Sequence, residues 1–577
     1  MCGICGIVGR EDDELIRRMC RLLSHRGPDE EGHYVEGGVS LGICRLRVID
    51  LETGSQPICN ETRTVWVVYN GEIYNFPELR RGLVARGHSF RSRSDTEVIV
   101  HLYEEEGETC VRHLRGMFSF ALWDTDKRSL LLARDRIGEK PLYFARHDGT
   151  LIFASEVKAV IEAMGRRPSL NPAVVDAYFT FLYNPTRSSI YRGIEKLPPG
   201  HVLTYRMQEM RISPYWNLSF PLRAPVELDE ECLCQRIRSC LREVVEMQLI
   251  SDVPLGAFLS GGIDSSTVVA LMSECSSRPV RTFSIGFDRV DESFNELSYA
   301  RLVARHFRTD HREYIVSPEV ADLVPDLLWY FDEPFGDSSS ILTYLVSRAA
   351  REHVTVALTG IGGDELFGGY PRYLGMLAAP MYDYLPDAVH TYFIQPLVGR
   401  LPHSSASHNM PARVQQFIAG RGLHPAARYT RWVSFFTEEE KGRLYSPAFG
   451  AQVTAEAHQQ PHQEAFRATS SQDVLDNVFY TDVKTYLVDD LLVMGDRMSM
   501  ANSLELRVPF CDYRLAELAA EIPGSLKVKR WRLKYLLKRS VRDLLPQSIL
   551  CRGKQGFMIP LARWLREELR ELALHVL

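Results

Sequence analysis

The 577-residue sequence contains no apolar run of the roughly 18 residues that a membrane-spanning helix needs, no internal repeat and no low-complexity tract. It also lacks an excess of positive charge, because 68 basic and 74 acidic residues leave a net charge of −6, so we expect no nucleic-acid partner. The opening MCGICGIVGR is too short and too glycine-rich for the apolar core of a signal peptide, and acidic residues follow it directly. We therefore expect a cytoplasmic protein without a membrane partner, whose 12 cysteines are mostly reduced thiols.

The composition is that of an ordinary folded protein, with 45% hydrophobic and 25% charged residues, and the length suggests two to four domains. The N-terminal part is rich in short strand candidates, with two helix candidates between them. We expect strands at 64–69, 118–123 and 130–134, a hairpin of 141–144 with 151–154 around His147-Asp-Gly149, and helices at 77–86 and 96–106. This pattern predicts a layered α+β domain.

The pattern of expected secondary structure changes after about residue 205. The stretch 217–229 contains two prolines and little periodicity, as is typical of a linker. We divide the chain into a domain at 2–205, a linker at 206–229 and a second domain at 230–577. Strands expected at 253–259, 281–287 and 354–359 alternate with helices such as 265–272, and from about 364 the pattern is mainly helical. This alternation predicts a doubly wound parallel sheet with a helical C-terminal extension.

Cys2 is the first candidate for chemistry. Removal of Met1 would place an α-amine, with a reference pKa of about 7.7–8.0, next to a thiol whose reference pKa is about 8.5. Such an N-terminal nucleophile carries its own base. Cys2 and Cys5 also form a CxxC pair, which leaves redox or zinc chemistry open, although no second CxxC completes a four-ligand zinc site.

The same region contains groups that could bind a free amino acid. Arg45 could pair with an α-carboxylate, and the carboxylates of Glu72 and Asp95 could take an ammonium group. The Asn70 amide and the Gly71 N–H could stabilise an oxyanion. Taken singly, each is more often part of a surface salt bridge or a turn.

These motifs occur together and in order. They are Cys2-Gly-Ile, Arg26-Gly-Pro-Asp29, Arg45-Leu, Asn70-Gly-Glu-Ile-Tyr-Asn75, Ser94-Asp-Thr-Glu97 and Arg134-Asp135. The set resembles class II glutamine amidotransferases, whose glutaminase domain is an N-terminal-nucleophile sandwich. The resemblance implies that Cys2 attacks the glutamine amide and releases ammonia, that Asn70 and the Gly71 N–H form the oxyanion hole, and that Arg45, Asn70, Glu72 and Asp95 hold glutamine.

A second loop, Ser260-Gly-Gly-Ile-Asp-Ser-Ser266, lies between a predicted strand and a predicted helix. Glycines let the backbone close on a phosphate, and hydroxyls with helix N-terminal N–H groups donate to it. Asp264 fits such a loop if Mg²⁺ lies between the carboxylate and the phosphate. The loop resembles that of ATP pyrophosphatases, which cleave ATP to AMP and PPi, and it lacks the spacing of a Walker A motif.

Further motifs extend the resemblance over roughly residues 2 to 560. They are Asp332-Glu-Pro334, Thr359-Gly-Ile-Gly-Gly-Asp-Glu-Leu-Phe-Gly-Gly-Tyr370, the segment 496–510 and Arg552-Gly-Lys-Gln-Gly-Phe557. With the glutaminase motifs they resemble glutamine-hydrolysing asparagine synthetases. The resemblance implies an α/β ATP pyrophosphatase domain in which Asp264 and Asp364 bind Mg²⁺-PPi and Lys534 and Lys554 lie near the phosphates. It also implies an adenosine pocket formed by Leu259, Ile285 and Gly360. Further ATP contacts are implied at Ser260, Gly261, Gly262, Ser265, Ser266 and Thr359.

The implied reaction is glutamine-dependent, ATP-consuming amidation of a carboxylic acid through an acyl-adenylate, with release of AMP, PPi and glutamate. Ammonia would travel through a shielded passage, and a homodimer is possible. Ile361 departs from the pattern, because the family usually carries Glu or Asp there, at the acceptor site. The departure leaves three interpretations: a tolerated change in an aspartate-using enzyme, an acceptor other than aspartate such as a biosynthetic intermediate or a cell-wall or sugar acid, or a slow or inactive synthetase. Intramolecular amide formation, a regulatory relative without catalysis and a tRNA-modifying enzyme are further alternatives.

Overall fold

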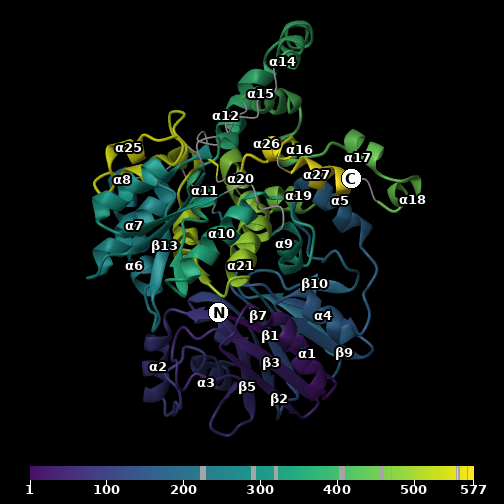
Figure 1. The fold of residues 1–577 in the computed structure, drawn as a ribbon, viewed down its shortest axis with the longest axis vertical. Coiled ribbons are helices and arrows are strands. Elements are labelled where there is room, and N and C mark those ends of the chain that lie inside the picture. Colours follow the sequence, from purple (N-terminus) through teal and green to yellow (C-terminus); the bar gives the residue numbers. More distant parts are fainter. Residues whose placement is uncertain are drawn as a thin grey trace.

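The computed structural model describes residues 1–577 apart from 221–228, 288–293, 317–322, 402–409, 454–459, 470, 554, 557–558, 568 and 577. Two units lie against each other in Figure 1, with the N-terminal strands at the bottom and the later, mainly helical part above them. The N-terminus lies between the units (Figure 1). Among the described helices, none combines the length and the apolar character that a membrane span requires.

The lower unit contains two six-stranded sheets whose neighbouring strands are all antiparallel. The first sheet has the order β10 (Ile194–Lys196), β8 (Tyr143–His147), β9 (Thr150–Ala154), β1 (Cys2–Val8), β3 (Val39–Arg45) and β2 (Glu30–Glu36). The second has the order β12 (Glu209–Pro214), β11 (His201–Arg206), β7 (Ser129–Arg134), β6 (Gly116–Asp124), β5 (Val65–Ile73) and β4 (Ile58–Cys59).

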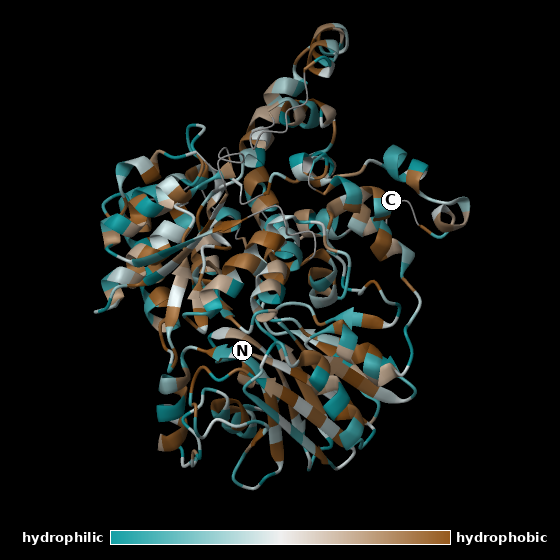
Figure 2. Ribbon diagram, viewed as in Figure 1, coloured by the Kyte–Doolittle hydropathy of each residue, from teal (hydrophilic) through white to brown (hydrophobic). Residues whose placement is uncertain are grey.

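The two sheets pack face to face over a shared apolar core. Ile4 and Leu41 of the first sheet and Val68 and Leu132 of the second belong to this core. Figure 2 shows how strongly hydrophobic residues concentrate in these strands. The outer faces are covered by helices of which the nearest are α1 (Asp13–Leu23), α4 (Val157–Met164), α2 (Phe76–Ala85) and α3 (Glu97–Glu106). This arrangement is the predicted N-terminal-nucleophile sandwich, and the strands and helices expected between 64 and 154 are all present.

The upper unit is built on a five-stranded parallel sheet. Its order is β15 (Asp310–Val316), β14 (Arg281–Phe287), β13 (Leu255–Phe258), β16 (Val356–Leu358) and β17 (Glu505–Arg507). In β16, Val356 and Leu358 face one apolar cluster and Ala357 faces another, so both faces of the sheet are covered. This is the predicted doubly wound α/β domain.

Helices surround this sheet and form the C-terminal extension. Around the sheet lie α6 (Glu230–Gln248), α7 (Ile263–Cys275), α8 (Leu297–Phe307), α9 (Val324–Phe331), α10 (Ser339–Arg351), α11 (Gly363–Phe367) and α21 (Leu492–Met500). In the described part of the chain, the other helices of eight or more residues are α5 (Pro172–Phe181), α12 (Pro371–Asp383), α15 (Met410–Ala419), α16 (Pro425–Val433), α19 (Gln460–Arg467), α20 (Val474–Asp482) and α22 (Tyr513–Glu521). A π-helical segment spans Val483–Leu491 and leads into α21.

The interface between the units is both apolar and ionic. Met1, Val48 and Met117 of the lower unit belong to the same buried cluster as Leu259 of the upper one. The guanidinium of Arg115 donates to Asp512 across the interface, with Nε 2.7 Å from Oδ2. These contacts hold the start of β1 against the upper unit.

Candidate functional site

Cys2 lies at the first residue of β1, at the interface of the two units. It is buried, stands opposite Arg45 in the register of β1 with β3, and donates its N–H to Oδ1 of Asn70 at 2.8 Å. Burial raises the pKa of the Cys2 thiol, against the opposing charges of the chain's terminal amine and Arg45. In the chain as it stands, the terminal amine is that of Met1, and it donates to Oε2 of Glu505 at 2.9 Å.

Asn70 and Gly71 lie near the end of β5, next to Cys2. Nδ2 of Asn70 is 3.5 Å from the hydroxyl of Ser119, and Gly71 has φ +157°. A Cβ on Gly71 would lie 2.1 Å from the carbonyl oxygen of Met117, so only glycine fits this close approach of β5 to β6. The structure thus brings the predicted nucleophile and the predicted oxyanion-hole residues together.

The predicted glutamine-binding residues surround the same point. Arg45 is buried and donates to the carbonyls of Ile49 and Asp50 at 3.0 and 2.8 Å, which fixes its guanidinium beside β1. Glu72 is also buried, and burial together with the charge of Glu505 raises its pKa. These contacts hold a cation and a carboxylate in fixed positions near Cys2.

Asp95 is held more firmly than the sequence indicates. Its Oδ2 accepts from the Tyr69 hydroxyl and from the Ile73 N–H, both at 2.9 Å. Burial raises its pKa, and these hydrogen bonds oppose that rise. Asp95 therefore also ties the loop before α3 to β5.

Arg26 is a site residue whose role the sequence did not assign, although it lies in the Arg26–Asp29 motif. Its Nε donates to the Cys2 carbonyl at 3.1 Å, and its Nη1 donates to Glu156 at 3.0 Å and lies 2.9 Å from Oδ2 of Asp496. Asp496 comes from α21 of the upper unit. Cys2 is thus linked by one side chain to the upper unit.

The Ser260–Ser266 loop joins β13 to α7, as predicted. The hydroxyls of Ser260 and Ser265 are 3.1 Å apart, and the Gly262 N–H donates to the Ser260 hydroxyl at 3.2 Å. Gly261 has φ +70°, and a Cβ there would meet the backbone of Tyr299 at 2.5 Å. The loop is therefore a tight turn that presents hydroxyls and helix N-terminal N–H groups.

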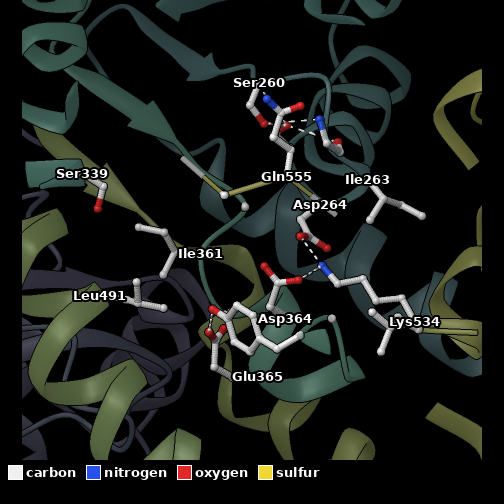
Figure 3. A pocket seen from close by; sticks show the side chains of 18 of the residues that line it. Ser260, Ile263, Asp264, Ser339, Ile361, Asp364, Glu365, Leu491, Lys534 and Gln555 are labelled. Carbon is white, nitrogen blue, oxygen red and sulfur yellow. Dashed lines mark hydrogen bonds and ion pairs between the residues drawn. The ribbon is translucent and has the colours of Figure 1, made fainter. Parts of the chain in front are cut away.

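Asp264 and Asp364 converge on one cation. The ammonium of Lys534 forms an ion pair with Asp264 and lies 2.5 Å from Oδ1 of Asp364 (Figure 3). Close packing brings the two loops together, because a Cβ on Gly363 would lie 2.5 Å from Oδ1 of Asp264. Two buried carboxylates that share one cation position fit Mg²⁺, which prefers oxygen ligands.

A cavity of about 1440 Å³ opens beside these loops. The predicted ATP residues that line it are Leu259, Ser260, Gly262, Asp264, Ser265, Ile285, Thr359, Gly360 and Lys534. Gly261 and Ser266 belong to the same turn, where Ser266 is buried under the loop and its N–H donates to the Gly262 carbonyl at 3.0 Å. Lys554 lies outside the described residues.

Ile361 lies on the wall of this cavity. It packs with Leu491 into the apolar cluster that contains Leu506 and Met494, and Figure 3 shows the Ile361 and Leu491 side chains next to each other. This part of the wall is therefore aliphatic.

Beyond Ile361 the cavity contains an ionic and aromatic group that the sequence did not reveal. Nη2 of Arg372 lies 2.9 Å from Oδ2 of Asp482, and the guanidinium stacks 4.0 Å from the centre of the Tyr370 ring. The Tyr370 hydroxyl donates to Glu365, whose pKa is raised to about 7 by burial and by Asp364. This part of the cavity wall thus combines a buried cation, carboxyl groups and aromatic rings.

Comparison with known proteins agrees with this architecture. Residues 1–216 match the family model of the glutamine amidotransferase domain, and residues 236–577 match that of asparagine synthase. The chain is 34% identical to asparagine synthetase [glutamine-hydrolyzing] 1 of Bacillus subtilis, in an alignment that covers 99% of this chain and 89% of that protein. It is 30% identical to asparagine synthetase [glutamine-hydrolyzing] 3 of the same organism (96% and 87% covered) and 28% identical to amidase chry2 of Gibberella zeae (94% and 84% covered).

The chain belongs to the glutamine-hydrolysing asparagine synthetase family, as its motifs predicted. Members of this family are carbon–nitrogen ligases, and the enzyme class expected from the sequence is confirmed.

Proposed function

We propose that this enzyme hydrolyses glutamine at Cys2 and uses the ammonia to amidate a carboxylic acid that it has activated with ATP as an acyl-adenylate. The observation that carries the proposal is the convergence of Asp264, Asp364 and Lys534 at the mouth of two glycine loops, in a chain that also holds a buried Cys2. We divide the functions between residues 2–205 and 230–577, joined by a linker at 206–229, in a cytoplasmic enzyme.

At the glutaminase site, Cys2 would act with its own amine once Met1 is removed. The Cys2 nitrogen already lies 2.8 Å from Oδ1 of Asn70, which would orient the free amine as a base for the thiol. The thiolate attacks the side-chain amide of glutamine, and the Asn70 amide and the Gly71 N–H stabilise the oxyanion. Ammonia leaves, and water hydrolyses the thioester to glutamate.

Arg45 would pair with the α-carboxylate of the bound glutamine, and Glu72 and Asp95 would take its ammonium group. Their burial supports this assignment, since ion pairs strengthen when water is excluded from them.

At the synthetase site, ATP would lie with its adenosine against Leu259, Ile285 and Gly360 and its phosphates on the 260–266 loop. Asp264 and Asp364 would hold Mg²⁺, which when bound neutralises charge on the phosphates. The acceptor carboxylate attacks the α-phosphorus and PPi leaves, with Lys534 balancing its charge. Ammonia then attacks the acyl carbon, which yields the amide and AMP.

Ammonia must stay unprotonated between the two sites. Val48 and Met117 at the interface belong to one apolar cluster with Leu259 of the adenosine pocket. An apolar route would disfavour ammonium, because burial of an unpaired charge is costly. This continuity supports a shielded passage.

The acceptor that we propose is an acid other than aspartate. Ile361 packs with Leu491 against the cluster that contains Leu506 and Met494 and cannot perform the proton transfer or orientation expected of a carboxylate at that position. The similarity to a protein named an amidase is compatible with a wider range of acceptors in related chains. Aspartate remains the alternative acceptor.

The test is PPi release from ATP with glutamine and a panel of carboxylic acids, against glutamine alone. We expect glutaminase activity without aspartate-dependent PPi release, and PPi release with another acid. Aspartate-dependent release with asparagine as the product would overturn the acceptor proposal and leave the reaction class intact. Absence of PPi release with every acid, in a protein that still binds ATP, would contradict the ligase proposal.

A further inference from the structure

Two histidines and two glutamates converge on the outer face of the glutaminase domain, away from both sites described above. His101 and Glu104 lie one turn apart on α3, His88 follows α2, and Glu61 lies in the turn between β4 and β5. One ligand atom from each residue lies within 4.8 Å of the others. Three separate segments therefore bring nitrogen and oxygen ligands to one point.

Three of the distances between these atoms are close to those of a tetrahedral metal site. Nδ1 of His101 is 3.0 Å from Oε2 of Glu104 and 3.6 Å from Oε2 of Glu61, and Nδ1 of His88 is 3.6 Å from Oε2 of Glu104. Ligands at Zn²⁺ bond lengths of about 2.0–2.1 Å lie about 3.3 Å apart in a tetrahedron. The four atoms lie within 4.8 Å of one another, so side-chain movements on the order of 1 Å would bring them to bonding distance.

Both histidines point one ring nitrogen inward and the other towards an outer carboxylate. Nε2 of His88 is 3.1 Å from Oε1 of Glu105, and Nε2 of His101 is 3.8 Å from Oε1 of Glu97. Histidines that bind metals usually carry such a carboxylate on the distal nitrogen, where it fixes the ring and its tautomer. The ring of the fully buried His101 is also fixed by Phe90, in an edge contact with centroids 4.6 Å apart.

Each of the two glutamates likewise has one carboxylate oxygen that faces the centre of the cluster and one that faces away from it. Oε1 of Glu104 accepts from Nδ2 of Asn60 at 2.7 Å, and Oε1 of Glu61 accepts from the Ser89 N–H at 2.8 Å. Each Oε2 is left facing the histidines. The two glutamates are thus oriented by partners that do not compete for the centre of the cluster.

The charges also favour a divalent cation. Four carboxylates, those of Glu61, Glu97, Glu104 and Glu105, surround two imidazoles, and Arg86 pairs with only one of them, at 2.8 Å from Glu105. With both histidines neutral, as metal ligands must be, this group carries an excess of negative charge that Zn²⁺ would compensate.

We propose that Glu61, His88, His101 and Glu104 bind one structural Zn²⁺ ion. The ion fastens the segment before the 94–97 loop to α3 and to the β4–β5 turn. That loop carries Asp95, so the ion stabilises the glutamine-binding side of the glutaminase domain without entering the reaction.

The test is a Zn²⁺ titration of the full-length, chelator-treated protein against a competing chromophoric chelator. All samples carry C232S and C551S, because the exposed thiols of Cys232 and Cys551 would otherwise compete for the metal. We expect the parent to bind one Zn²⁺ per chain and to show a higher Tm with Zn²⁺. H88Q and H101Q should each bind Zn²⁺ with an affinity at least about 100-fold lower and should show no rise in Tm with Zn²⁺. E105Q, which alters only an outer partner, should lower affinity roughly 10- to 100-fold.

H113Q is the matched control, because His113 is an exposed histidine that pairs with one glutamate, at 2.6 Å from Glu106. It should bind Zn²⁺ like the parent. H88Q removes a partly exposed side chain and should fold even if H101Q does not. Absence of tight Zn²⁺ binding by the parent would overturn the proposal, as would unchanged affinity in H88Q.

Discussion

Nη1 of Arg26 lies 2.9 Å from Oδ2 of Asp496, and this buried ion pair joins the glutaminase sandwich to helix α21 of the α/β domain. The same guanidinium donates to the carbonyl of Cys2. Both residues belong to motifs that are far apart in the sequence, and the fold brings the two motifs into contact. A movement of α21 would reach the backbone of Cys2 through a single side chain.

We predict that Asp496→Asn loosens the coupling of the two activities. The substitution keeps the shape of the side chain but removes the charge that faces Arg26 and Lys140, and loss of one member of a buried pair costs about 3–5 kcal/mol of stability at most. Glutamate formed per amide should rise above one, while ammonium-driven amidation persists. Asp512→Asn, which affects the interface pair with Arg115, is the control, and equal uncoupling in both variants would argue against a specific role of Arg26–Asp496.

We expect Cys2→Ala to abolish glutamine-dependent activity and to leave amidation with ammonium. Cys2 is the buried thiol whose main-chain N–H contacts Asn70, and it stands opposite Arg45 in the register of β1 with β3. The measurement compares amide formation from glutamine and from ammonium chloride. Cys5→Ala, three residues along the same buried strand, should retain both activities. Retention of glutamine use in Cys2→Ala would show that the nucleophile is another group.

Asp264→Asn should abolish PPi release with either nitrogen source. One of the two carboxylates on the shared cation position would be lost, and removal of a single electrostatic group of this kind lowers turnover by about 10²–10³-fold. PPi release is followed with glutamine and, separately, with ammonium. Glu274→Gln, a change on the outer side of the same helix α7, should have little effect. PPi release at the parental rate in Asp264→Asn would contradict the metal-binding role.

Local sequence signals were sufficient for much of the fold. The mainly apolar stretch 118–123 and the turn at His147-Asp-Gly149 predicted β6 and the β8–β9 hairpin, because strand-forming residues and turn chemistry are encoded within a few residues. Strand β1 was not predicted, since Cys2–Val8 contains two glycines and no alternation. It is a strand because β3 and β9 pair with it on both sides, which is a tertiary effect.

The candidate sites likewise contain residues that local motifs revealed and residues that only the fold brings together. Cys2, Asn70 and the Ser260–Ser266 loop were identifiable because each motif carries its own chemistry. The Arg372–Asp482 pair was not, because its members are 110 residues apart and only the fold brings them together. The sequence did suggest the cation position, through Asp264 in its glycine-rich loop and through the resemblance for Asp364.

Ile361→Glu should impair the enzyme with its own acceptor and not merely change its preference. A carboxylate at this position would face the aliphatic chains of Leu491 and Leu506, where an unpaired charge is costly. We expect PPi release with the active acid to fall on the order of tenfold or more, with Ile361→Val within a few-fold of the parent. Undiminished PPi release in Ile361→Glu would show that this wall does not contact the acceptor.

Glu365 makes stability depend on pH. Its pKa is raised to about 7 by burial and by the charge of Asp364, so the folded protein prefers the protonated form that the unfolded chain loses near pH 4.5. The stabilisation by the bound proton is complete below about pH 4.5 and is lost as the pH rises towards 7, by about 1.4 kcal/mol per unit of pH within that window. Glu365→Gln removes this pH-dependent contribution to the free energy of unfolding and keeps an acceptor for the Tyr370 hydroxyl. The free energy of unfolding of Glu365→Gln, relative to the parent, should therefore increase between pH 5 and pH 7 by up to about 3 kcal/mol in denaturant titrations. Glu274→Gln, at an exposed ion pair, should show no such trend, and parallel pH profiles for Glu365→Gln and the parent would mean that Glu365 is already ionised at pH 5.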